Sequence, residues 1–212
     1  MKRVPILFII TILFLGCSKI DLSTYSEMKS DNLLSNSFSN NELKDLAKIV
    51  DFFEDEMCNN FNKNDKTNIK KCYDKFNIRD SISYRGGSYL KFINFKSQEK
   101  LYKQLDSSLL YQIWRNTRCY PDSARVIKTL GIRAWDGKYF EFLKKAGKRE
   151  ELFKVYSDNM ALVNDIGISN SLLLTHHYKM MNMNDLKIRL LYAVQYLTIN
   201  EDINFTENSP CL

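Results

Sequence analysis

Apolar side chains recur at intervals of three and four residues along most of this chain, and this periodicity restricts the fold more than any other feature. The pattern is clearest over residues 39–57, where Ser39 and Glu42 also have the spacing of a capping box. Shorter stretches of the same kind follow over 67–78, 97–114, 123–130, 139–146, 152–163, 169–178 and 184–197. The sequence therefore predicts an all-α fold, built as a compact array of seven or eight helices.

Two segments interrupt the helical pattern. Between Asp80 and Phe95 the pair Gly86-Gly87 is a turn signal with strand-forming residues on both sides. A hairpin or an irregular aromatic loop fits this segment, and we predict a loop because isolated two-stranded hairpins are only marginally stable. Pro121 ends the next helix, since the residue before a proline avoids helical geometry. No repeat of constant period occurs, so we expect residues 40–212 to form a single helical domain rather than a solenoid.

The amino terminus has the composition of a targeting signal. Lys2 and Arg3 precede residues 4–15, which carry no charge. This stretch is long enough for the core of a signal peptide and too short for a permanent transmembrane helix, which needs about 20 residues. We therefore expect the segment to direct the chain across a membrane.

The residues Leu13-Phe14-Leu15-Gly16, which precede Cys17, resemble the lipobox of bacterial lipoproteins. The resemblance implies that residues 1–16 are a signal peptide and that Cys17 carries the acyl chains that hold the protein at the membrane. It also implies location in the bacterial cell envelope, and Ser18 resembles the class sent to the outer membrane of Gram-negative bacteria. An ordinary secretory signal is the alternative. The resemblance covers about 17 residues and says nothing of the domain that follows.

Residues 17–39 are polar and rich in Ser and Asn, with little periodicity. This composition predicts a flexible, lipidated tether between the membrane and the helical domain. The alternative is that part of the segment packs on the domain, and Leu33-Leu34 is the best candidate for such a contact.

Four further cysteines remain after Cys17: Cys58, Cys72, Cys119 and Cys211. An even number of cysteines in an exported chain indicates disulfides, and four cysteines allow three pairings. We favour Cys58 with Cys72, because a polar loop joins the two helices that carry them, and Cys119 with Cys211, which would fix the carboxyl terminus. A zinc site is the less favoured alternative, since the close ligand pairs typical of zinc are missing.

The charge balance argues against a nucleic-acid partner. The formal charge of +6 includes Lys2 and Arg3, so without residues 1–16 there are 29 basic and 25 acidic residues, a net charge of +4. Positive and negative residues are interleaved instead of forming the basic patch that nucleic acids require. We therefore expect no nucleic acid among the partners.

Short catalytic motifs do not occur in the sequence. His176 and His177 are adjacent, and neighbouring residues on a helix point about 100° apart, so the two do not easily share one metal. We therefore predict no catalytic residue, no metal ligand and no cofactor. A hydrolase of peptidoglycan or polysaccharide remains the main alternative, since an acidic residue in a helical fold has no short signature.

Two aromatic and basic segments are typical of recognition surfaces. One is the turn at Gly86-Gly87, and the other is the predicted carboxyl end of a helix before Cys119. The candidate binding residues are Tyr84, Arg85, Tyr89, Trp114, Arg115 and Arg118. The sequence thus favours an envelope domain that binds an unknown protein or envelope polymer, with an inhibitor of a secreted toxin or a purely structural protein as further alternatives.

Overall fold

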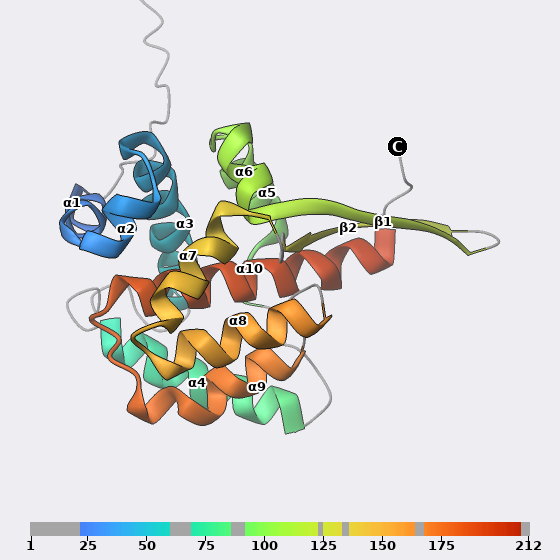
Figure 1. The fold of residues 1–212 in the computed structure, drawn as a ribbon. Helices are drawn as coiled ribbons and strands as arrows, with labels where there is room; N and C mark the ends of the chain where they lie inside the picture. Colours follow the sequence, from blue (N-terminus) through green and yellow to red (C-terminus); the bar gives the residue numbers. More distant parts are fainter. Residues whose placement is uncertain are drawn as a thin grey trace, which may run out of the picture.

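The computed structural model describes residues 22–59, 69–85, 92–122, 125–132, 136–163 and 168–208. Over these ranges the chain forms ten α-helices, one short 3-10 helix and one hairpin of two strands. The predicted all-α class is confirmed for the body of the molecule (Figure 1). The number of helices is larger than the seven or eight predicted.

The elements follow one another along the chain without a repeated unit. They are α1 (Leu22–Ser30), α2 (Asn32–Ser37), α3 (Asn40–Asn59), α4 (Ile69–Arg85), α5 (Phe95–Tyr102), α6 (Ser107–Ile113), β1 (Trp114–Asp122), β2 (Arg125–Ile132), α7 (Lys138–Gly147), α8 (Glu151–Val163), α9 (Ile168–His177), η2 (Tyr178–Met180) and α10 (Leu186–Asn208).

The first two helices correct the prediction of a flexible tether. Residues 22–38 fold against the body, with Met28 and Leu34 fully buried. Thr24 donates a hydrogen bond to Asp51 of α3 at 2.7 Å, and the Asp31 carboxylate caps the amino end of α2. Packing at Leu33-Leu34, the alternative considered from the sequence, is confirmed for Leu34. Residues 17–21 and the predicted signal peptide lie outside the described residues.

The capping box predicted at the start of α3 is present. The Ser39 backbone amide donates to the Glu42 carboxylate at 2.6 Å, and the Glu42 amide donates to the Ser39 hydroxyl at 3.4 Å. Lys138 of α7 adds an ion pair with Glu42 at 2.8 Å. Burial works in the opposite direction, but these bonds hold the pKa of Glu42 below its ordinary value. The carboxylate therefore ties the beginning of α3 to α7.

The hairpin β1–β2 replaces two predicted helical segments. Helix α6 ends at Ile113, and the helix expected over 123–130 is wrong, because residues 125–132 form β2. The strands pair antiparallel, with Thr117 opposite Thr129 and Pro121 opposite Val126. Most residues of β2 are strand formers, and a proline is tolerated on an edge strand. The hairpin extends beyond the helical body (Figure 1).

Helix α10 is the central element of the core. It runs through the middle of the helical body, with α4, α8 and α9 on one side and α3, α5 and α7 on the other (Figure 1). An aromatic cluster joins it to its neighbours: Phe76 of α4 lies 4.6 Å from the Tyr196 ring of α10, and 5.8 Å from the Phe53 ring of α3. Edge-to-face rings at such distances add to the burial energy of the core.

Helix α4 is attached to this core by polar bonds as well as by packing. The hydroxyls of Tyr192 and Tyr196 on α10 donate to Asn77 at 3.1 Å and to Asp80 at 2.5 Å. The helix continues to Arg85, so the loop predicted from Asp80 onward is wrong for residues 80–85. A helix long and apolar enough to cross a membrane does not occur in the described part of the chain.

Candidate functional site

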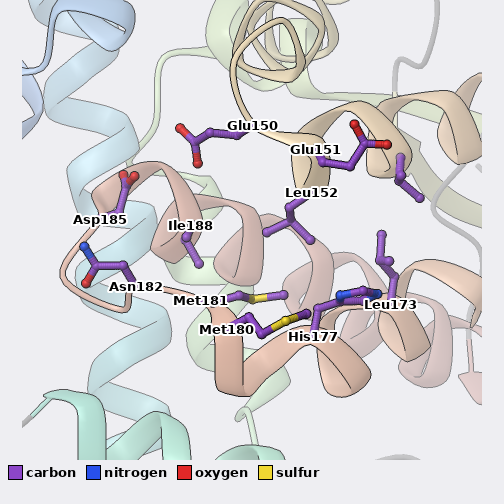
Figure 2. A pocket seen from close by; sticks show the side chains of 11 residues that line it. Glu150, Glu151, Leu152, Leu173, His177, Met180, Met181, Asn182, Asp185 and Ile188 are labelled. Carbon is purple, nitrogen blue, oxygen red and sulfur yellow. The ribbon is translucent and has the colours of Figure 1, made fainter.

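A pocket of about 510 Å³ opens where the start of α8, the end of α9 and the start of α10 meet (Figure 2). Ligand pockets of proteins commonly have volumes of roughly 300–1,000 Å³. The lining residues are Glu150, Glu151, Leu152, Val155, Leu173, His177, Met180, Met181, Asn182, Asp185 and Ile188. They come from two segments of the chain, 150–155 and 173–188.

The turn from α7 into α8 places one wall of the pocket. Gly147 ends α7, and a Cβ atom added there would lie 2.8 Å from the backbone of Lys154. Only glycine permits this close approach of the two helices. The tight turn brings Glu150 and Glu151 to the pocket at the first residues of α8.

The rim of the pocket is acidic. Glu150, Glu151 and Asp185 lie around its mouth (Figure 2). Lys187 pairs with Asp185 at 2.8 Å and with Glu150 at 3.8 Å, and it also lies 3.4 Å from Asp31. The charged lining residues are thus three carboxylates, and Lys187 offsets part of their charge.

Burial and charge act on these rim groups in different ways. Burial raises the pKa of Glu150 in spite of Lys187. Burial would lower the pKa of Lys187, but the surrounding carboxylates outweigh it and raise that pKa. Glu151 is exposed and makes no hydrogen bond or ion pair with the other described residues, so it is the rim carboxylate most available to a cationic ligand.

The floor of the pocket is apolar and contains two methionines. Leu152 of α8 faces Leu173 of α9 and Ile188 of α10 across it (Figure 2), and Val155 of α8 also lines the pocket. The Tyr192 hydroxyl lies 3.7 Å from the Met181 sulfur. Met180, in contrast, is 76% exposed. An exposed methionine beside a hollow is a flexible apolar contact that adapts to ligands of different shape.

A buried ion pair holds α10, the helix that contributes Ile188 to the pocket, in its position. Arg189, next to Ile188 on α10, donates to both carboxylate oxygens of Glu54 on α3, at 2.5 and 2.6 Å. The Tyr73 hydroxyl donates to the same carboxylate at 3.1 Å. Both charged side chains are about nine-tenths buried, at 11% and 10% exposure. The amino end of α10 is therefore held firmly against α3.

The residues predicted to form a recognition surface are not found together in the described part of the structure. Trp114 is 1% exposed and donates from its indole nitrogen to Thr198 at 2.8 Å, so its assignment to a surface is wrong. Its ring packs inside because the chain turns from α6 into β1 at this residue. The side chains of Tyr84, Arg85, Arg115 and Arg118, and all of Tyr89, lie outside the described residues.

The structure joins Cys58 to Cys72 in a disulfide, with 5.3 Å between the two Cα atoms. This is the first of the two pairings favoured from the sequence. The Cys119 side chain, Cys211 and Cys17 lie outside the described residues, so the second pairing and the lipid site stay predictions.

The buried acids of the described residues, Asp45, Glu54, Asp80 and Glu201, do not line the pocket. Glu54 is bound by Arg189, and Asp80 accepts hydrogen bonds from Tyr196 and Thr175 within the core. Among the described residues, no group of three or more His, Cys, Asp and Glu side chains is arranged to hold a metal ion.

One feature of the sequence does point to this site. The run from His176 to Met183 holds two histidines and three methionines in eight residues. Its neighbour across the pocket, the start of α8, is more than twenty residues away in the chain, so periodicity alone does not reveal their contact.

No protein-family model, curated protein or solved structure matches this chain.

Proposed function

We propose that this chain is a lipid-anchored protein of the bacterial cell envelope that binds a basic, amphipathic segment of another protein in the pocket between α8, α9 and α10. The observation that carries the proposal is the combination of apolar lining residues with three carboxylates at the rim. A partner with apolar and basic residues on one face complements both parts.

A protein segment suits this surface better than a compact small molecule because a further exposed apolar side chain, Leu162, lies on α8 outside the pocket, beyond the polar residues Asp158 and Asn159. Leu152, Val155 and Leu162 lie at helical spacing along α8, and Leu162 is 84% exposed. Ten residues separate Leu152 from Leu162, which corresponds to about 15 Å along a helix. A helix laid beside such a strip makes contacts at intervals of three and four residues.

The charge of the partner follows from the local and overall charges. The chain without residues 1–16 has a net charge of +4, so it repels a basic segment in general. At the rim the sign is reversed, and Glu151 is exposed there. The rim carboxylates attract a basic segment, whereas the rest of the positively charged chain repels it. This contrast favours one orientation of the bound segment, which is a source of specificity.

The proposed anchor lies close to the folded body. The start of α1 at Leu22 is five positions after Cys17, the acylated residue of the lipobox. Five extended residues reach at most about 18 Å. Because residues 22–38 are folded, the pocket would meet its partner near the membrane surface. Cys17→Ala should release the protein from membranes, and unchanged membrane association or unchanged lipid labelling would contradict the anchor.

The binding proposal is tested with two labelled peptides of about 14 residues, one of Leu and Lys and one of Leu and Glu in the same amphipathic pattern. Fluorescence anisotropy with the full chain should show binding of the Leu/Lys peptide alone. Glu151→Lys replaces one attraction by one repulsion, about 0.2–1 kcal/mol each, and should weaken binding about 2- to 30-fold.

The matched control is Glu99→Lys on α5, an exposed glutamate that does not line the pocket. Leu173→Gln tests the apolar floor and should also weaken binding. The proposal is overturned if both peptides bind equally well, or if Glu151→Lys and Glu99→Lys have the same effect. Binding of small cationic amphiphiles in place of the peptide would assign the pocket to a different ligand class.

A further inference from the structure

We infer that His177, Met180 and Met181 form a binding site for a soft monovalent metal ion, Cu(I), along the exposed edge of the pocket. This inference goes beyond the proposed function, because it uses the sulfur and nitrogen atoms of this edge and not the acidic rim.

The three side chains come together at the end of α9. His177 is the last residue of α9, and the 3-10 helix η2 follows at once and ends at Met180. His177 and Met180 are three residues apart across this turn and so lie on the same side of it, and Met181 follows in extended backbone. All three side chains line the one pocket, and Figure 2 shows the imidazole and the two thioethers gathered along this edge. An ion entering the pocket therefore meets the three donors from one side.

Met180 is more exposed to solvent than the other methionines in the described part of the chain. Met28, Met57 and Met160 are fully buried, and Met183 is 3% exposed. Met180 is 76% exposed, and His177 is exposed as well. Packing explains the buried methionines, but it does not explain a thioether held at the surface beside an imidazole.

The Met181 sulfur is held in position from behind. The hydroxyl of Tyr192, which is fully buried, lies 3.7 Å from this sulfur, and its one proton has the Asn77 side-chain oxygen at 3.1 Å as its nearest acceptor. A thioether sulfur has two lone pairs, so one remains for a metal even with this contact. Polar groups behind a ligand fix its orientation, which lowers the entropy lost on binding.

The chemistry of the donors selects the ion. Thioethers are soft, uncharged ligands that favour Cu(I), and imidazole binds copper as well. Zn²⁺ and Ca²⁺ prefer thiolate, imidazole or oxygen ligands, and only the single imidazole of this set suits them. Lys179 lies between the ligands in the sequence and its charge opposes that of the ion, so the affinity has to come from the donor atoms. The ion binds as Cu(I), and no electron transfer is needed.

The test measures Cu(I) transfer from its bicinchoninate complex to the full chain under anaerobic conditions. We expect one ion per chain, with affinity reduced tenfold or more by Met180→Leu and by His177→Gln. His176→Gln is the matched control, since His176 is the adjacent exposed histidine and does not line the pocket. It should leave the affinity unchanged.

Silver(I), which is diamagnetic and chemically similar, provides a second readout. In a chain with ¹³C-methyl methionine, Ag(I) should shift the methyl signals of Met180 and Met181 and leave those of Met28, Met57 and Met160 in place. Equal effects of His176→Gln and His177→Gln, full affinity in Met180→Leu, or shifts of the core methionines would overturn the inference. Because Glu151→Lys tests the rim and Met180→Leu tests the metal site, failure of either proposal is recognised separately.

Discussion

The ion pair between Arg189 and Glu54 leads to a quantitative prediction for stability. Arg189→Met removes two charge-assisted hydrogen bonds, at 2.5 and 2.6 Å, and leaves a carboxylate that is 10% exposed without its cation. Bonds of this kind contribute about 1.5–3 kcal/mol each, and breaking a buried pair by removing one partner costs about 3–5 kcal/mol. We expect Arg189→Met to lower the free energy of unfolding by about 3–5 kcal/mol.

Urea denaturation followed by circular dichroism measures this loss. The double variant Glu54→Leu/Arg189→Met removes both charges. Its free energy of unfolding should fall by less than that of Arg189→Met alone, because no charge stays buried without a partner. Lys144→Met is the control, since it breaks an exposed pair with Glu141 at 51% and 48% exposure and should cost less than about 1 kcal/mol. A loss below about 1 kcal/mol for Arg189→Met, or a larger loss in the double variant, would refute the reasoning.

Three further predictions concern buried groups. Burial raises the pKa of Asp80. At pH values just above the ordinary Asp pKa of about 3.9, the folded chain therefore binds more protons at this group than the unfolded chain does. The contribution of Asp80 to the free energy of unfolding accordingly becomes more favourable as the pH falls through that window. The difference in Tm between the native chain and Asp80→Asn should therefore move in favour of the native chain from pH 7 to pH 4.5, and a constant difference would contradict it. Replacing Cys58 and Cys72 by Ala should lower the free energy of unfolding, measured by urea denaturation, by about 3 kcal/mol, which is the loop-entropy value for a separation of 14 residues. A loss near zero would argue against a stabilising disulfide. Among the described residues, neither polar side-chain atom of buried Asn170 has a hydrogen-bond partner, so Asn170→Leu should keep or raise Tm, and a clear fall would show that the amide is needed.

The sequence predicted those parts of the fold in which local pattern and packing agree. In α3 the capping box of Ser39 and Glu42 and the long apolar stripe both indicate a helix, and the structure has one there. At Cys58 and Cys72 the polar loop between two helices indicated the pairing that the structure contains.

The failures have physical reasons. Val126, Ile127 and Leu130 occur at spacings that fit a short helix, but β-branched residues also suit a strand, and pairing with β1 decides the outcome. The segment around Met28 and Leu34 has too few apolar residues to indicate burial, and its helices are held by contacts with α3. Periodicity describes one element at a time, whereas such contacts join distant elements.

Most of the candidate site could not be predicted from the sequence, for the same reason. Glu151 and Leu173 belong to helices that meet only after folding, and nothing in either local pattern shows that they line one pocket. Trp114 was assigned to a surface because its neighbours are basic, but it is buried against Thr198. The exposed Met180 was the available signal, although its exposure is visible only in the structure.

The central claim is that the pocket between α8, α9 and α10 binds a basic amphipathic segment, and the methyl groups of its methionines report on this directly. In a full chain with ¹³C-methyl methionine, the Leu/Lys peptide should shift the Met180 and Met181 signals in a saturable manner, while those of Met28, Met57 and Met160 stay in place. The Leu/Glu peptide should produce no shift. Binding of the Leu/Lys peptide without any change at Met180 and Met181, or equal shifts with both peptides, would contradict the account.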